Sequence, residues 1–98
     1  MVIERADIEV ISGRESEFET VMAHGCALLA GAAGCTAVSL LRCIERPSRF
    51  ALNIEWTSFA DHQAFTKTPN FQTFRDLAGP FFVERPAMEH FQQVLPAL

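Results

Sequence analysis

The spacing of apolar residues along this chain indicates secondary-structure elements in the order strand, helix, strand, strand, helix, strand. This order limits the possible folds. Side chains of a strand alternate between two faces, whereas one face of a helix repeats every three or four residues. The order β, α, β, β, α, β is that of the split βαβ unit, in which helices cover one face of an antiparallel sheet. We therefore expect an α+β, ferredoxin-like fold with a four-stranded antiparallel sheet, spanning residues 1–98 as a single domain.

The first strand and the first helix are predicted from the N-terminal third of the chain. β-branched residues are interleaved with charges over residues 2–11, and Ser12-Gly13 then ends the predicted strand. Residues 15–33 have the apolar spacing of one helical face, with acidic residues in the first turns, where the helix dipole favours negative charge. Gly34 follows, and glycine commonly ends a helix.

The middle of the chain predicts a β-hairpin. Residues 35–45 and 49–57 have strand composition, and Arg46-Pro47-Ser48 lies between them as a turn. The second strand of this hairpin alternates strictly, so one of its faces belongs to the core and the other carries polar groups. The core face would hold Phe50, Leu52, Ile54 and Trp56, and the opposite face Ala51, Asn53, Glu55 and Thr57.

Two helix starts and a last strand complete the pattern. Ser58 with Asp61 three residues later is a variant of the capping box and predicts a short helix. Thr68-Pro69 predicts the start of another helix, because proline is tolerated at the first helical position. Residues 84–94 resemble an edge strand, with Pro86 near its start, where the missing hydrogen-bond donor does least harm.

The apolar content of the chain is high for one small core. Apolar residues make up 49% of the 98 residues, and nine of them are phenylalanine. A sheet with helices on one side only leaves its second face uncovered, and the same face of another copy can cover it. The sequence therefore predicts a two-fold homodimer.

Charge and residue usage exclude several classes of protein. Eight Lys and Arg residues against twelve Asp and Glu residues give a net charge of −4, which argues against a nucleic-acid partner. No apolar run reaches the roughly 18 residues needed to span a membrane, and the charged N-terminus does not resemble a signal peptide, so we expect a cytoplasmic protein. Cys26, Cys35 and Cys43 fit neither a disulfide scaffold nor a zinc pattern, so we expect buried or half-buried thiols and no metal.

Several short segments occur in an informative order: a Gly before the first helix, a Trp that ends a strand, and a Pro followed by Phe in the later helix. The segments are Ile11-Ser12-Gly13-Arg14-Glu15, Ala33-Gly34-Cys35, the strand from Phe50 to Trp56, Ser58-Phe59-Ala60-Asp61-His62, and Thr68-Pro69-Asn70-Phe71 with Phe74. This ordered set resembles the antibiotic biosynthesis monooxygenase domain family. The resemblance extends over nearly the whole chain.

The resemblance implies a homodimer of ferredoxin-like protomers whose sheets meet in a dimeric α+β barrel. It also implies oxygenation of quinols, polyketide-like or other electron-rich aromatic substrates by dioxygen, with no metal or flavin cofactor. A separate branch of the family degrades haem. Its members typically have an Asn on the first strand, a Trp near the short helix and a His on the later helix. This chain has no Asn on the predicted first strand, Phe65 at the position of the Trp, and no His in residues 69–78, so haem degradation is disfavoured.

A cofactor-free oxygenase must deprotonate its substrate, so that the resulting anion can reduce dioxygen. The protein then supplies a base, donors for the oxyanion and a dry apolar slot. Histidine is the natural base because its unperturbed pKa lies near neutrality. His62 is our first candidate, since the short helix would lie across the mouth of a cavity between helices and sheet. His90, on the last strand, would either line the site or point into the intersubunit barrel, and His24 would lie at the edge of the helical apolar stripe.

Other candidate residues have both a functional and a structural interpretation. Trp56 could stack on an aromatic substrate and donate its N–H, or fill the core. Asn53 could donate to an oxyanion, or bridge the barrel from the face opposite Trp56. Arg75 could bind an acidic substrate, or be an exposed charge. The expected cavity wall, with core packing as the alternative, consists of Phe65, Phe71 and Phe74, together with Phe81 and Phe82.

Two further functional hypotheses remain at this point. One is a non-catalytic homodimer that binds a small hydrophobic ligand in the same cavity. The other is isomerisation of a small phosphorylated molecule, which would need cationic residues at the pocket, where Arg75 is the candidate. Convergence of His62 and Trp56 on one enclosed pocket would favour catalysis, and a space filled by Phe side chains would favour binding.

Overall fold

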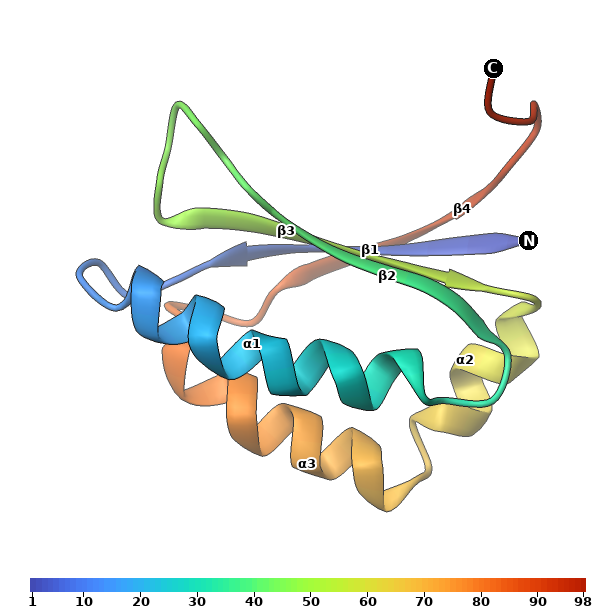
Figure 1. Ribbon diagram of the computed structural model, residues 1–98, viewed down its shortest axis with the longest axis horizontal. Helices are drawn as coiled ribbons and strands as arrows, with labels where there is room; N and C mark the ends of the chain where they lie inside the picture. The colour runs from blue at the N-terminus through green and yellow to red at the C-terminus, as the bar shows by residue number, and fades with distance from the viewer.

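The computed structural model describes residues 1–98, which form one sheet with all helices on one of its faces (Figure 1). The sheet has the strand order β2-β3-β1-β4, and every neighbouring pair is antiparallel. This confirms the predicted α+β, ferredoxin-like fold. The elements are β1 (Val2–Glu9), α1 (Glu15–Ala30), β2 (Cys35–Arg42), β3 (Arg49–Trp56), α2 (Phe59–Phe65), α3 (Pro69–Ala78), a 3₁₀ turn (Gly79–Phe81) and β4 (Ala87–Gln92).

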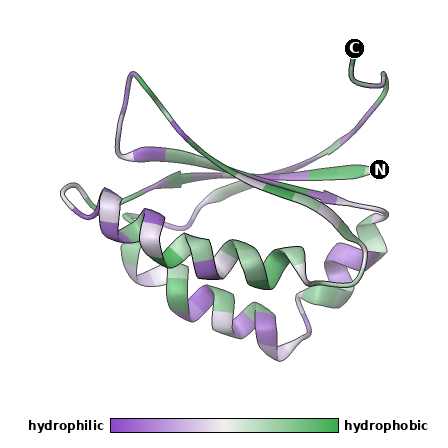
Figure 2. Cartoon of the chain, in the orientation of Figure 1, coloured by the Kyte–Doolittle hydropathy of each residue, from purple (hydrophilic) through white to green (hydrophobic).

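The core lies between the central strands and α1. β3 alternates as predicted, and Phe50, Leu52, Ile54 and Trp56 are all buried. Across from them β1 contributes Ala6 and Ile8, and α1 contributes Phe18, Met22 and Leu29 at helical spacing. In Figure 2 much of α1 is coloured as hydrophobic along its length beneath the strands. The apolar faces of sheet and helix therefore bury one another.

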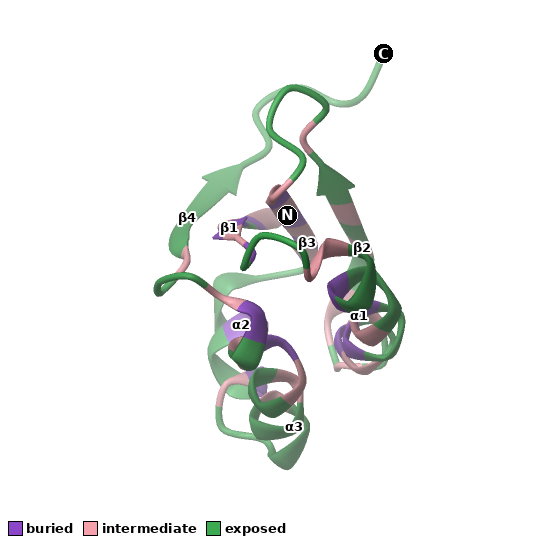
Figure 3. Cartoon of the chain, turned by 90° about the vertical axis from the view of Figure 1, so that its left-hand side faces the viewer, coloured by how far each residue is buried: buried purple, intermediate pink, exposed green.

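The two longer helices do not cover the sheet equally. α1 packs under β2, whereas α3 packs mainly on α1, and Figure 3 shows it farther from the strands. Gly25 of α1 permits this close approach, because a Cβ there would lie 3.3 Å from the ring of Phe74. The half of the sheet formed by β1 and β4 consequently has open space beneath it.

Several predicted boundaries extend beyond the observed elements. β1 ends at Glu9, although Val10 N still donates to the Ser48 carbonyl (2.8 Å) and Val10 forms an isolated bridge with Phe82. α1 ends at Ala30 rather than residue 33, because Ala32 N donates to Leu29 in a tighter turn. β2, β3 and β4 are also shorter than the predicted 35–45, 49–57 and 84–94. The helix predicted over residues 69–78 is observed with those bounds.

The three α-helices contain 16, 7 and 10 residues. None of them combines the length and the apolar character needed to cross a membrane.

The start of α2 is fixed by hydrogen bonds to a neighbouring loop. Ser58 accepts from Asp61 N (3.2 Å), and the hydroxyls of Thr57 and Ser58 donate to the Asp61 carboxylate, which lowers its pKa. Thr57 N donates to the Gly34 carbonyl at 2.8 Å. Gly34 has φ +83°, and a Cβ there would clash with the Asp61 side chain. The α1–β2 loop thus sets the position of α2.

We predict that Gly34→Ala lowers the free energy of unfolding by more than the roughly 1–2 kcal/mol expected for a left-handed non-glycine residue alone. The added methyl group must displace Asp61 and its hydrogen bonds. Urea denaturation measures the loss. Gly13→Ala is the matched control, because Gly13 has φ +92° but a Cβ added there would meet no atom within 4 Å. Equal losses in the two variants would show that the Asp61 contact contributes nothing.

Candidate active site

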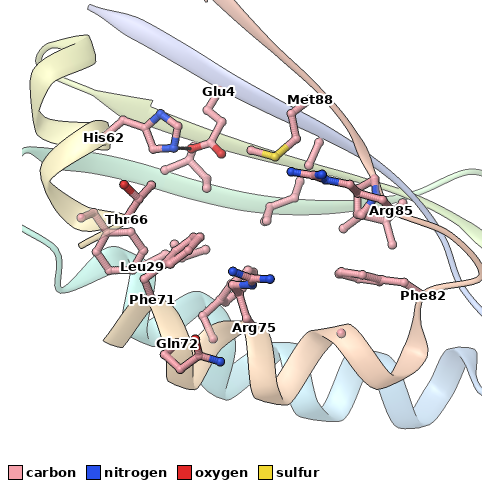
Figure 4. A pocket seen from close by; sticks show the side chains of 18 of the residues that line it. Glu4, Leu29, His62, Thr66, Phe71, Gln72, Arg75, Phe82, Arg85 and Met88 are labelled. Carbon is pink, nitrogen blue, oxygen red and sulfur yellow. Dashed lines mark ion pairs between the residues drawn. The ribbon is translucent and has the colours of Figure 1, made fainter. Parts of the chain in front are cut away.

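A cavity of about 630 Å³ lies between the β1–β4 half of the sheet and α3 (Figure 4). Its volume is in the range of small-molecule sites, about 300–1,000 Å³. Its walls are mainly apolar and come from β1, β3, α1, α3 and the segment before β4. Ionisable side chains lie at the α2 end, where Glu4 and His62 are, and toward the opposite end, where Arg75 and Arg85 are. Thr66, Gln72 and Asp76 also line the cavity.

The polar residues at the α2 end form a chain of close contacts. Glu4 is only 5% exposed and accepts a hydrogen bond from Trp56 Nε1 at 3.0 Å. The same carboxylate oxygen lies 3.3 Å from Nε2 of His62, which is 9% exposed. On the other side of the ring, His62 Nδ1 is 3.0 Å from His90 Nε2. The side chains therefore run in the order Trp56, Glu4, His62, His90.

Strand register and the helix cap bring these residues together. Glu4 is paired with Ile54 on β3 and with His90 on β4, so all three project from the helix-covered face. His62 lies in the middle of the seven-residue α2, four residues after the Ser58 cap. Its ring stacks on Trp56 with centroids 5.5 Å apart and an interplanar angle of 30°.

Burial makes the neutral form of His62 the dominant one at neutral pH. Desolvation lowers the pKa of this imidazole, the Glu4 charge partly opposes that effect, and His90 adds to it. An ionised Glu4 can only accept, so its position 3.3 Å from Nε2 favours the neutral tautomer with the proton on Nε2. In that tautomer Nδ1 is the acceptor in the contact with His90, and His90 Nε2–H is the donor.

Glu4, His62 and His90 could also be considered as metal ligands, since one ligand atom of each lies within 4.8 Å of the others. However, His62 presents Nε2 to Glu4 and Nδ1 to His90, on different sides of its ring. In the present side-chain arrangement these contacts form a chain, in which the two ring nitrogens of His62 face different residues.

The structure brings most of the predicted site residues to the cavity. His62, Phe65, Phe71, Phe74 and Arg75 all line it. His90 joins the cluster through His62, on the helix-covered side of the sheet instead of facing an intersubunit barrel.

Two predicted catalytic residues lie elsewhere. Trp56 is 0% exposed and lies behind Glu4 rather than in the cavity wall, with its only donor occupied by Glu4. Asn53 pairs with Arg5 and Ser39 on the other face of the sheet, away from the cavity. His24 is exposed on α1. Cys26 is half-buried, and burial raises the pKa of its thiol.

Sequence reasoning missed Glu4 and Arg85. A signal for Glu4 was present, because it alternates with the apolar Val2, Ala6 and Ile8 and so falls on the buried face of β1. A charged residue at such a position needs partners. Arg85 had no comparable signal, since it lies in the irregular segment before β4.

Comparison with known proteins gives consistent relatives. The family model described as antibiotic biosynthesis monooxygenase matches residues 1–77. The uncharacterized protein YczJ of Bacillus subtilis is 32% identical over 95 residues, covering 96% of this chain and 100% of YczJ. A crystal structure from Bordetella bronchiseptica, named for the same family, is 39% identical with a TM-score of 0.90, over 96% of this chain and 97% of that one.

SnoaB, a cofactor-independent oxygenase from Streptomyces nogalater, has a TM-score of 0.86 at 20% identity, over 97% of this chain and 94% of SnoaB. At this identity the likeness concerns the fold.

We predict that the pKa of His62 makes the protein less stable in mild acid. Because this pKa is lowered in the folded state, the unfolded chain binds the proton more readily. The contribution of neutral His62 is therefore fully present above about pH 6.5 and is lost as the pH falls toward the folded pKa. Urea unfolding at a series of pH values from 7.5 to 5 should show a decline that is smaller in His62→Gln.

The exposed His24 provides the control, because His24→Gln should retain the wild-type decline. The assignment would be wrong if His62→Gln and the wild type lost stability equally over this range.

Proposed function

Because the chain belongs to the antibiotic biosynthesis monooxygenase family, we propose that it is a cofactor-independent monooxygenase of an electron-rich aromatic, quinol or polyketide-like substrate. The observation that carries the proposal is the buried Glu4–His62 pair at one end of an apolar cavity. This is an arrangement that can remove a proton from a substrate away from water.

In this mechanism His62 is the base. Its burial keeps the imidazole neutral, so that Nδ1 can accept a proton. The substrate hydroxyl then replaces His90 as the hydrogen-bond partner of Nδ1. The imidazolium that forms has Nε2 3.3 Å from a carboxylate oxygen of Glu4, whose charge stabilises it. Trp56 holds the carboxylate from the other side, so Glu4 and Trp56 act as positioning residues.

The substrate anion then supplies the electrons for the reaction with dioxygen. For an anthrone, a ring methylene and O₂ give a carbonyl and water, so that one oxygen atom enters the product and no external reductant is required. Leu29, Ile54 and Phe71 in the cavity wall exclude water from the anion.

The proposal includes a homodimer formed through the helix-free face of the sheet. Figure 1 shows no helix on this face, which carries Ile3 and Phe91 among polar residues. Oδ1 of Asn53 is buried there without a hydrogen-bond partner in the protomer. A second copy packed on this face can supply that partner, which gives Asn53 a structural rather than a catalytic role.

A second candidate function is non-catalytic binding of a small hydrophobic ligand in the same cavity. The observation in its favour is that Trp56, expected as a substrate contact, donates its N–H to Glu4 and does not reach the cavity. Most of the wall would then serve only to bury an apolar ligand.

Oxygen uptake distinguishes the two functions. We expect chelator-treated protein to consume oxygen, with saturation, on at least one member of a panel of dihydroxynaphthalenes, anthrones and quinols. Activity that appears only after a metal ion or flavin is added would contradict the cofactor-independent mechanism. Tight binding of panel members without any uptake would favour the second function.

We predict that His62→Ala lowers kcat about 100-fold or more, as expected for the loss of a general base. His24→Ala, which changes an exposed histidine of α1, should retain wild-type kcat. Circular dichroism and urea unfolding check that the variant is folded, and His62→Gln replaces it if the buried Glu4 destabilises the alanine variant. A folded variant at either substitution with unchanged kcat would remove His62 from the mechanism.

Glu4→Gln tests the positioning role. The Glu4 charge raises the pKa of His62, so the substitution should lower that pKa further and move the acidic limb of the kcat–pH profile to lower pH. KM should change little. A lower rate with an unshifted profile would indicate that Glu4 has only a structural role.

A further inference from the structure

The arginines of this chain fall into two groups. Five of the seven form an ion pair with a carboxylate within 4.0 Å. These five are Arg5, Arg14, Arg42, Arg46 and Arg49. The two without a carboxylate partner, Arg75 and Arg85, are the two arginines that line the cavity. In a chain with twelve acidic residues and eight basic ones, free arginines gathered at one cavity are a specific arrangement.

Nearby acidic residues form no ion pair with these arginines. Asp76 follows Arg75 in α3 and also lines the cavity, but its carboxylate accepts from Gln72 Nε2 at 2.8 Å and is not within 4.0 Å of either guanidinium. Glu84 precedes Arg85 and forms no ion pair with it within 4.0 Å. Figure 4 shows the two guanidinium groups pointing into the cavity from opposite sides, Arg75 from α3 and Arg85 from the segment before β4.

The position of Arg75 is also supported by packing. Its guanidinium carbon lies 5.6 Å from the centroid of the Phe71 ring, and both side chains line the cavity. A guanidinium over an aromatic face keeps its N–H donors free in the guanidinium plane. Arginine donors presented in this way bind planar or tetrahedral anions through paired hydrogen bonds.

We propose that Arg75 and Arg85 form an anion subsite, and that the substrate carries a carboxylate or phosphate group at the end opposite its reactive hydroxyl. This inference rests on the proposed function for the role of His62, and it defines the substrate class more narrowly. The ligand is an amphipathic aromatic acid. Its anionic oxygens lie between Arg75 and Arg85, its ring lies against the apolar wall, and its hydroxyl lies at His62.

Binding measured without turnover tests the subsite. Isothermal titration of the full chain with 4-hydroxy-1-naphthoic acid and with 1-naphthol compares two phenols that differ by one carboxylate. We expect the acid to bind about 10-fold tighter or more, because charge-assisted hydrogen bonds are the strong ones. Arg75→Gln and Arg85→Gln should each reduce this preference, and the double variant should abolish it.

Arg14→Gln is the charge-matched control. Arg14 is paired with Glu17 and does not line the cavity, so this variant loses the same charge and should keep the preference. A third probe, 1-naphthyl phosphate, separates the two sources of anionic oxygens, since tighter binding than the acid assigns the subsite to a phosphate. Equal affinity of the wild type for 1-naphthol and both anions would overturn the proposal, as would a preference that survives in the double variant.

Oxygen uptake on neutral 1,4-dihydroxynaphthalene separates this inference from the proposed function. Oxygen uptake without any preference for anionic ligands would support the oxygenase proposal and contradict the anion subsite. A preference for anionic ligands that depends on both arginines, with no oxygen uptake on any substrate, would support the anion subsite and contradict the oxygenase proposal.

Discussion

The burial of the Glu4 carboxylate is the constraint on which the arrangement of the site depends. A buried carboxylate without partners is costly, so the surrounding elements must supply donors. Trp56 at the end of β3 donates at 3.0 Å, and Nε2 of His62 in the middle of α2 lies 3.3 Å from the same oxygen. These two contacts tie the first strand, the third strand and the short helix to one atom of one side chain. The tautomer of His62 and its contact with His90 follow from that arrangement.

The cavity has a different physical origin. Gly25 lets Phe74 approach α1 closely, so α3 packs on α1 and not on the sheet. The space beneath β1 and β4 is therefore left open by helix–helix packing, and the Phe side chains of α2 and α3 wall it without filling it. The many apolar residues of the sequence are therefore found in three places: this cavity wall, the core, and the uncovered face of the sheet.

The fold could be predicted because it depends on periodicity, and the strict alternation of Phe50, Leu52, Ile54 and Trp56 is observed unchanged in β3. His62 could be placed near the cavity from the Ser58 cap alone. The partners of His62 could not be predicted, because the pairing of Glu4 with His90 depends on the register between β1 and β4. A shift of β4 by one residue against β1 would move His90 to the opposite face, away from Glu4. Trp56 was ambiguous for a similar reason, since a core position and a cavity wall share one face of the sheet.

The edge strand beside the cavity differs from the rest of the sheet. All six residues of β4 are exposed, and the strand pairs with β1 alone. Segments with little buried surface open locally at a lower free-energy cost than the core does. Pro86 and Met88, just before and in this strand, line the cavity, so an edge strand that is exposed in the protomer is also one of its walls. Transient detachment of β4 would admit a rigid polycyclic ligand while β1, β3 and α1 stay packed, and the exchange of ligands would then be governed by the kinetics of one edge strand.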